Sequence, residues 1–211
     1  MPIINFTTRE VRLKIALHGT PASGRAATLA KLHADSPASK GGLAIPEDAK
    51  DKPFSFSFSG EDRSVFEGFT TRFEFHSLTG GPSSPDSVRL LLRDADGVVF
   101  VVDSQWEKLE DNLQSLQEAE EALKADGSAL DEIPWVLQYN KRDLPEVAPA
   151  NYIDFLLNNR SKPAPVFETV ATTGDGIPAL RKAIVERVLA RFAEEYGQKL
   201  VAPEEQASSA A

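Results

Sequence analysis

Gly19 and Gly24 stand five residues apart in a stretch that is rich in small residues. The stretch follows a strand-like pattern and leads into a helix-forming one, which is the setting of a phosphate-binding loop. In such a loop, successive backbone N–H groups wrap an anion at the N-terminus of the helix. The spacing therefore predicts a phosphate-binding loop whose residues are Gly19, Ser23, Gly24, Arg25, Ala26 and Ala27.

Two positions of this loop depart from the consensus Gly-x-x-x-x-Gly-Lys-Ser/Thr. Arg25 stands in the lysine position, and its planar guanidinium keeps the charge but is shaped differently from a lysine ammonium. Ala26 stands in the hydroxyl position, and a methyl group cannot ligate Mg²⁺; the next hydroxyl along the helix is Thr28. An ordinary glycine-rich turn between a strand and a helix is the alternative that these residues leave open.

Hydrophobic periodicity predicts the strands and helices that must position this loop. Alternation predicts a strand over residues 11–18, and good helix formers follow at 26–32. Residues 35–52 are rich in Pro, Ser, Gly and charge and predict a long loop. Two alternating aromatic stretches, 54–58 and 69–75, predict an antiparallel hairpin with its turn at 60–68.

The second half of the chain alternates apolar runs with helical patterns. A continuous apolar run at 97–102 is typical of a parallel strand covered on both faces, residues 134–139 predict another buried strand, and residues 165–170 predict a last strand. The expected helices span 88–93, 109–123, 149–158 and 177–196. This order predicts an α/β fold with a mostly parallel sheet and right-handed crossovers. We expect one domain over 11–198, a lead-in segment at 1–10 and a flexible C-terminal tail at 199–211.

Composition excludes several kinds of partner and cofactor. The net charge of −9 argues against binding to nucleic acid. The 211-residue chain has no apolar run near the roughly 20 residues of a membrane span and no secretion signal, so we expect a cytoplasmic protein. It has no cysteine and begins Met-Pro, so no lipid anchor is expected. His18, His33 and His76 lack ligand spacing and are interpreted as isolated structural histidines.

The stretch Asn140-Lys141-Arg142-Asp143, directly after a predicted buried strand, resembles the Asn-Lys-x-Asp guanine motif of the Ras-like small GTPases. The resemblance implies that the Asp143 carboxylate accepts the guanine N1–H and 2-amino hydrogens. It also implies that Asn140 ties the base to the glycine loop, while the aliphatic stem of Lys141 covers the ring. A charged surface turn after a strand is the alternative interpretation.

Further sequence segments resemble one branch of that superfamily in particular. Residues 68–73, 96–103 and 140–145 are similar to the bacterial gliding-motility and cell-polarity GTPases of the MglA type. Ala171 and Thr172 resemble the last guanine loop, where a backbone N–H meets the base oxygen. The implied fold is a three-layer, P-loop small GTPase-like one: a six-stranded, mostly parallel sheet with one antiparallel edge strand. Helices would cover both faces, with the site at the carboxyl ends of the strands.

Within this resemblance, the switch segments depart from the family pattern. Pro53, with Lys52 beside it, stands where the first switch carries a threonine, and proline offers neither a hydroxyl nor an N–H. Gly80 of the second switch is kept, but Gly81 replaces the glutamine that orients attacking water. Ser77 stands where many relatives have a metal-linked acid. The residues of the guanine motifs are therefore kept, whereas the residues expected to bind Mg²⁺ and the γ-phosphate are replaced.

Three hypotheses follow from this pattern. The first is a pseudo-GTPase that binds GTP or GDP, has weak or absent hydrolysis and acts through protein contacts in cell polarity or gliding motility. Its effector surface would lie on the 54–75 hairpin and the switch-like loops, and Ala26 and Pro53 argue against a bound Mg²⁺. The second is a GTP-hydrolysing switch activated by a partner, such as a roadblock-type regulator. The third is a scaffold with an empty nucleotide pocket.

Overall fold

The computed structural model describes residues 2–36, 43, 53–59, 68–78 and 83–201. The predictions made for Lys52, Gly80 and Gly81, and for most of the 35–52 and 60–68 loops, lie outside these ranges. In chain order the elements are β1 Ile3–Asn5, β2 Glu10–Gly19, α1 Arg25–Ala34, β3 Pro53–Ser59, β4 Thr70–Leu78, α2 Pro85–Leu92, β5 Gly97–Asp103, η1 Trp106–Lys108, α3 Leu109–Ala125, η2 Leu130–Glu132, β6 Trp135–Asn140, α4 Ala150–Leu157, β7 Val166–Glu168 and α5 Ile177–Val201.

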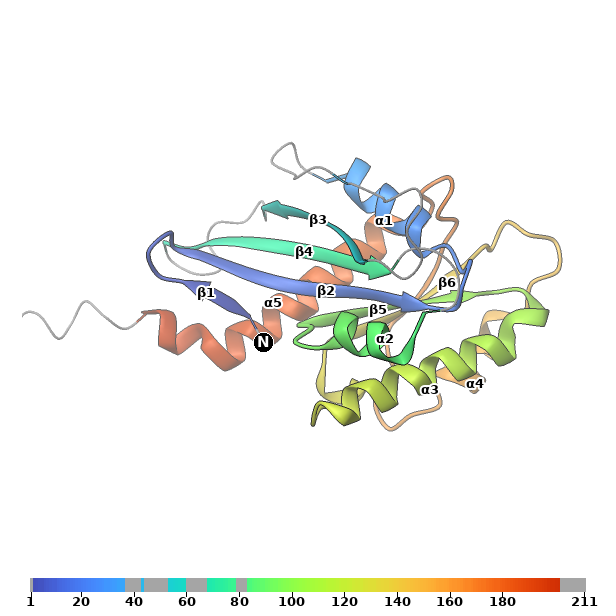
Figure 1. Cartoon of the computed structure of the whole chain (residues 1–211). Coiled ribbons are helices and arrows are strands. Elements are labelled where there is room, and N and C mark those ends of the chain that lie inside the picture. Colours follow the sequence, from blue (N-terminus) through green and yellow to red (C-terminus); the bar gives the residue numbers. More distant parts are fainter. Residues whose placement is uncertain (1, 37–42, 44–52, 60–67, 79–82, 202–211) are drawn as a thin grey trace, which may run out of the picture.

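One central sheet organises the molecule, with the strand order β3-β4-β2-β5-β6-β7 (Figure 1). The pairs from β4 through β7 are parallel, and β3 pairs antiparallel with β4 at the edge. The predicted α/β class and antiparallel edge hairpin are therefore confirmed. A seventh strand, β1, pairs antiparallel with β2 inside the expected lead-in segment. At three residues it is too short for its alternation to be recognised in the sequence.

Two hydrophobic cores lie on opposite faces of the sheet. Helices α1 and α5 enclose one core, and α2, α3 and α4 enclose the other. Along β5, Val99 and Val101 pack into the first core, whereas Val98, Phe100 and Val102 pack into the second. Because both faces are covered, the strand is apolar from Val98 to Val102, as expected of a central parallel strand.

The aromatic face of the β3–β4 hairpin belongs to the first core. Phe56 stacks on Phe75 with ring centroids 5.5 Å apart, and Phe58 stacks on Phe73 at 5.4 Å. All four rings are buried. The predicted effector surface on this hairpin does not include its aromatic side chains, because they face the core. Within the described residues, the opposite side of the hairpin and the outer edge of β3 remain for a partner.

Two helices differ in length from the sequence prediction. Helix α2 begins three residues earlier than predicted, at Pro85, because the Ser84 hydroxyl accepts the Ser87 N–H at 3.2 Å and proline occupies the first turn. Helix α5 continues to Val201, beyond the expected end at residue 196. In the described part of the chain, no helix has the length and apolar composition needed to cross a membrane.

Candidate functional site

The glycine loop connects the carboxyl end of β2 to the first turn of α1. Gly24 caps α1 with φ 106°, a left-handed conformation that side chains rarely adopt. A Cβ atom at Gly24 would lie 2.0 Å from the Asn140 amide nitrogen. A Cβ at Gly19 would lie 2.1 Å from the Val101 carbonyl oxygen. Glycine is therefore required at both positions because β5 and β6 approach the loop so closely.

Asn140, the last residue of β6, fastens the loop to the segment that follows β7. Its Nδ2 donates to the Ser23 carbonyl at 2.8 Å, and its Oδ1 accepts the Ala171 N–H at 2.9 Å. The same Oδ1 accepts the Thr169 hydroxyl at 3.2 Å. The side chain is buried, so these bonds lie in a low-dielectric environment where breaking them is costly. The structure thus brings Ser23, Gly24, Asn140 and Ala171 together.

The other residues of the guanine-like motif are more accessible. Lys141 has φ 65°, and its Nζ lies 2.5 Å from the Asp103 carboxylate and 3.3 Å from Gln105 Oε1. Asp143 is exposed, and within the described residues its carboxylate has no hydrogen-bond or ion-pair partner. Thr172 is also exposed. Because Asn140 already accepts the Ala171 N–H, a base oxygen would have to share that donor.

The residues at the position expected to ligate Mg²⁺ lie in the first turn of α1. Ala26 is exposed and Ala27 half-buried. The hydroxyl of Thr28 is fully buried and accepts the Gln138 Nε2–H at 2.8 Å, so it cannot replace a hydroxyl at Ala26. Within the described ranges, no group of three or more His, Asp or Glu side chains is placed to hold a metal ion.

The described switch-like residues lie in regular strands. Ser77 is fully buried near the end of β4, where its hydroxyl donates to the Leu17 carbonyl at 3.2 Å. Pro53 is the first residue of β3 and pairs with Leu78. The Ser77 hydroxyl is therefore engaged by the backbone of β2 rather than directed at the loop.

A cavity of about 290 Å³ lies beside the glycine loop, between α2 and α3, and Arg25 and His18 line it. Burial, together with the nearby Arg25 charge, lowers the pKa of His18 to about 4, so the ring is neutral at pH 7. Its Nε2 lies 3.1 Å from the Ser115 carbonyl, which assigns the proton to Nε2 and leaves Nδ1 as an acceptor. His18, predicted to be an isolated structural histidine, therefore contacts α3, and nothing in the sequence places it there.

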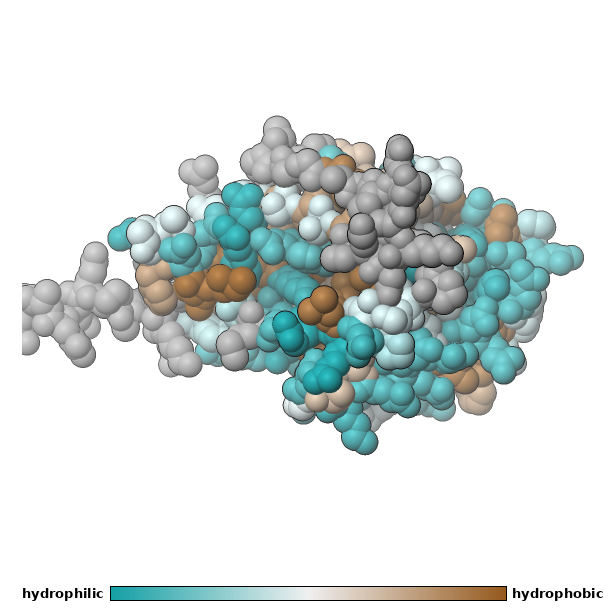
Figure 2. Space-filling view, viewed as in Figure 1, coloured by the Kyte–Doolittle hydropathy of each residue, from teal (hydrophilic) through white to brown (hydrophobic). Residues whose placement is uncertain are grey.

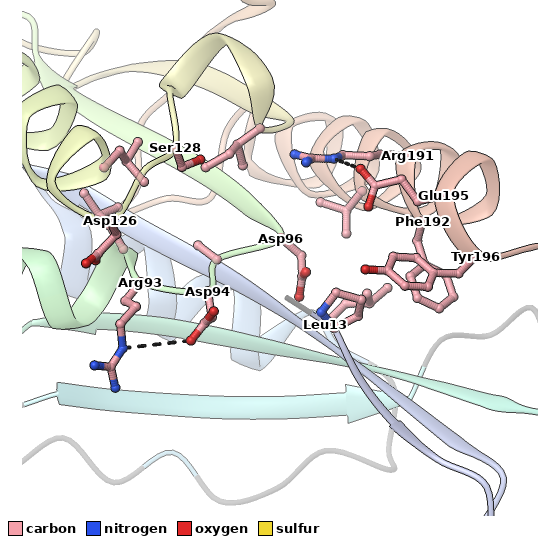
Figure 3. A pocket seen from close by; sticks show the side chains of 16 residues that line it. Leu13, Arg93, Asp94, Asp96, Asp126, Ser128, Arg191, Phe192, Glu195 and Tyr196 are labelled. Carbon is pink, nitrogen blue, oxygen red and sulfur yellow. Dashed lines mark hydrogen bonds and ion pairs between the residues drawn. The ribbon is translucent and has the colours of Figure 1, made fainter.

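Figure 3 shows a second cavity, of about 440 Å³, at the opposite end of the sheet. Its polar side chains are largely engaged: Arg191 donates to Glu195 at 2.7 Å, and Asp96 accepts the Lys14 backbone N–H at 2.8 Å. It lies beside the amino ends of β5 and β6, whereas open α/β sheets bind ligands at the carboxyl ends. None of the predicted site residues lines it.

The sheet order, the glycine loop and the Asn140 contacts at the carboxyl ends of parallel strands define a protein of the Ras-like small GTPase class. The chain is 35% identical over 190 residues to the mutual gliding-motility protein MglA of Myxococcus xanthus (strain DK1622). The alignment covers 90% of this chain and 96% of that protein. The chain therefore belongs to the MglA family, which confirms the resemblance found in the sequence. No protein-family model matches the chain.

Replacing Asn140 by alanine should destabilise the fold even without a ligand. The change leaves the Ser23 carbonyl and the Ala171 N–H unpaired, and each unsatisfied buried group costs about 1–3 kcal/mol. We expect urea denaturation of nucleotide-stripped protein to show a loss of about 2–4 kcal/mol in the free energy of unfolding. Asn159→Ala, at an exposed site, is the control. Equal stability of the two variants would contradict this account.

His18 should make stability depend on pH. Its folded pKa of about 4 lies below the unfolded value of about 6.5, so the unfolded chain takes up the proton first as the pH falls. Stability should therefore decline from about pH 6.5 towards pH 4, with a slope of at most about 1.4 kcal/mol per pH unit from this group. His18→Gln should flatten the curve measured by urea denaturation, and an unchanged slope in this variant would contradict the account.

Proposed function

We propose that this chain is a guanine-nucleotide-binding protein with weak or absent GTP hydrolysis. It acts through protein–protein contacts in gliding motility or cell polarity. The observation that carries the proposal is the contrast at the glycine loop. On one side, Asn140 holds Ser23 and Ala171 together. On the other, Ala26 presents only a methyl group to solvent.

The guanine side has the groups that recognition of this base requires. The Asp143 carboxylate is accessible and can accept both the N1–H and the 2-amino hydrogens, which adenine does not present in that arrangement. Asp103 holds the Lys141 ammonium, which leaves the aliphatic stem to cover the base. Ala171 and Thr172 begin the loop that would meet the base oxygen.

On the phosphate side, GTP or GDP would be held by the loop N–H groups and the charge of Arg25. No hydroxyl at Ala26 or Pro53 is available to ligate Mg²⁺, so the proposed binding depends little on the metal. Gly81 has no side chain to orient a water molecule for attack on the γ-phosphate. These three positions together favour slow or absent hydrolysis.

Protein contacts would then carry the biological role. The relative in Myxococcus xanthus is described as a mutual gliding-motility protein, which supports a motility or polarity effector as the partner of this chain. A roadblock-type regulator remains part of this proposal, because a partner could supply groups that the chain lacks. An empty scaffold is the other alternative, and nucleotide analysis together with GTP turnover, measured with and without a partner, separates the three.

The first test is chromatography of the supernatant from denatured, freshly purified protein, combined with calorimetry on Asp143→Asn. We expect a bound guanine nucleotide in the wild-type protein. Replacing the carboxylate by an amide should weaken GDP binding roughly 10- to 100-fold, because each hydrogen bond to a charged group contributes about 1.5–3 kcal/mol. The variant should instead favour xanthosine diphosphate, which has an oxygen where guanine has the 2-amino group.

Glu146→Gln removes an exposed carboxylate from the same loop and serves as the matched control. It should leave GDP binding unchanged. An empty wild-type protein that binds neither GDP nor GTP would favour the scaffold. GTP turnover that appears only with a partner protein would favour the partner-activated switch. Rapid Mg²⁺-dependent turnover by the protein alone, abolished by Asp143→Ala, would contradict weak hydrolysis.

The second test restores the missing hydroxyl. Ala26→Ser places it in the first turn of α1 without disturbing a buried contact, because Ala26 is exposed. We expect the ratio of GTP affinities with Mg²⁺ and with EDTA to rise about tenfold, equivalent to about 1.4 kcal/mol. Ala27→Ser, one position further, should leave the ratio unchanged. An equal rise in both variants would show that the hydroxyl does not act at the metal position.

A further inference from the structure

Three large side chains are exposed on one side of the molecule, close to the guanine-like loops. Trp106 of η1 is 50% exposed, and Tyr152 and Phe155 of α4 are 44% and 66% exposed. The rings of Trp106 and Tyr152 lie 5.3 Å apart with an interplanar angle of 49°. We call these three residues the aromatic face. Much of the exterior in Figure 2 is hydrophilic, so a gathering of large exposed rings calls for an explanation.

The aromatic face stands on a rigid base. An isolated antiparallel bridge joins Gln105 to Val147, and the Ala148 N–H donates to the Ser104 carbonyl at 2.8 Å. Arg142 donates to the Ala148 carbonyl at 2.7 Å. These bonds fix η1 and the start of α4 to the ends of β5 and β6. Because the backbone beneath the rings is already held in place, less conformational entropy is lost there when a partner binds.

The charged groups near the aromatic face that lack an ion-pair partner among the described residues are acidic. Glu107 and Glu110 follow Trp106, and Glu146 precedes the bridge to Gln105. All three are exposed and, within the described residues, none forms an ion pair. The neighbouring cations are engaged elsewhere: Lys108 with Asp111, Lys141 with Asp103 and Arg142 with Glu168. The complementary ligand is therefore cationic.

The chain already contains the interaction that such a ligand would make. Arg160 lies over the Trp135 ring with its guanidinium carbon 5.0 Å from the ring centroid. The same guanidinium forms ion pairs with Glu120 and Asp131. An arginine can therefore interact with aromatic rings and with flanking carboxylates at the same time. Its planar guanidinium stacks on a ring with its face and donates hydrogen bonds to carboxylates in its own plane.

We propose that the aromatic face is a docking surface for an arginine-bearing segment of a partner protein. The guanidinium would stack on Trp106 and Tyr152 and pair with the adjacent carboxylates, while apolar side chains of the segment would cover Phe155. This rests on the protein contacts of the proposed function but not on its nucleotide site. It places a partner surface outside the switch-like loops.

The test uses the full chain and three acetylated, amidated peptides: tetra-arginine, tetra-lysine and tetra-glutamate. Trp106 is half-exposed and the second tryptophan, Trp135, is buried, so a change in emission on titration reports mainly on Trp106. We expect saturable quenching by tetra-arginine, weaker binding of tetra-lysine and none of tetra-glutamate. Binding of tetra-arginine should weaken at least about tenfold between 0.05 M and 0.5 M salt, because the pairing charges are exposed.

The double variant Trp106→Ala, Tyr152→Ala removes the rings without changing the net charge, and calorimetry replaces fluorescence for it. We expect at least about tenfold weaker binding of tetra-arginine, equivalent to about 1.4 kcal/mol. Leu90→Ala, which shortens an exposed apolar side chain on α2, should bind like the wild type. Equal binding by the double variant and the wild type would overturn the proposal, as would equal binding of tetra-arginine and tetra-glutamate.

Two further measurements, of the oligomeric state and of the bound nucleotide, separate this proposal from self-association and from the nucleotide-binding function. Sedimentation of the wild-type protein should show a monomer; a dimer that the double variant abolishes would assign the aromatic face to a second copy of the chain and overturn the proposal. Bound nucleotide should be the same in the double variant and the wild type. If the protein binds tetra-arginine but no nucleotide, the docking surface is supported and only the proposed nucleotide-binding function is contradicted.

Discussion

The hydrogen bonds of the Asn140 carboxamide are the constraint on which the rest of the site depends. One side chain joins the glycine loop before α1 to the loop before α5, using both its donor and its acceptor. This is possible because β6 lies between β5 and β7 in the sheet, so the carboxyl ends of the strands meet. The same contact explains Gly24, since any side chain there would collide with the Asn140 amide.

The structure also shows how the loop keeps its shape without the usual metal ligand. Gln138 Nε2 donates to the hydroxyls of Thr28 and Thr169, which links α1 to β6 and to the end of β7. These bonds are buried and internal to the protein, so they hold the first turns of α1 whether or not a cation is present. Loss of a hydroxyl at the exposed Ala26 leaves this network untouched.

The guanine-like loop and the aromatic face share one support. Asp103 at the end of β5 pairs with Lys141, and Gln105 contacts the same ammonium two residues later. Trp106 follows directly. A change in the position of Lys141 would therefore affect the residues at the base of the aromatic face. This would give a physical route for linkage between the proposed nucleotide and the proposed partner.

The sequence by itself determined the α/β class, the hairpin at the sheet edge and the residues of the glycine and guanine-like loops, because periodicity and short motifs are local properties. Only the tertiary structure decided that the Thr28 hydroxyl accepts a hydrogen bond from Gln138, that the Ser77 hydroxyl donates to the backbone of β2 and that the His18 ring faces α3. It also added β1 to the sheet and brought Trp106 next to Tyr152. These contacts join residues far apart in the chain, and which of them meet is set by the packing of whole helices on the sheet.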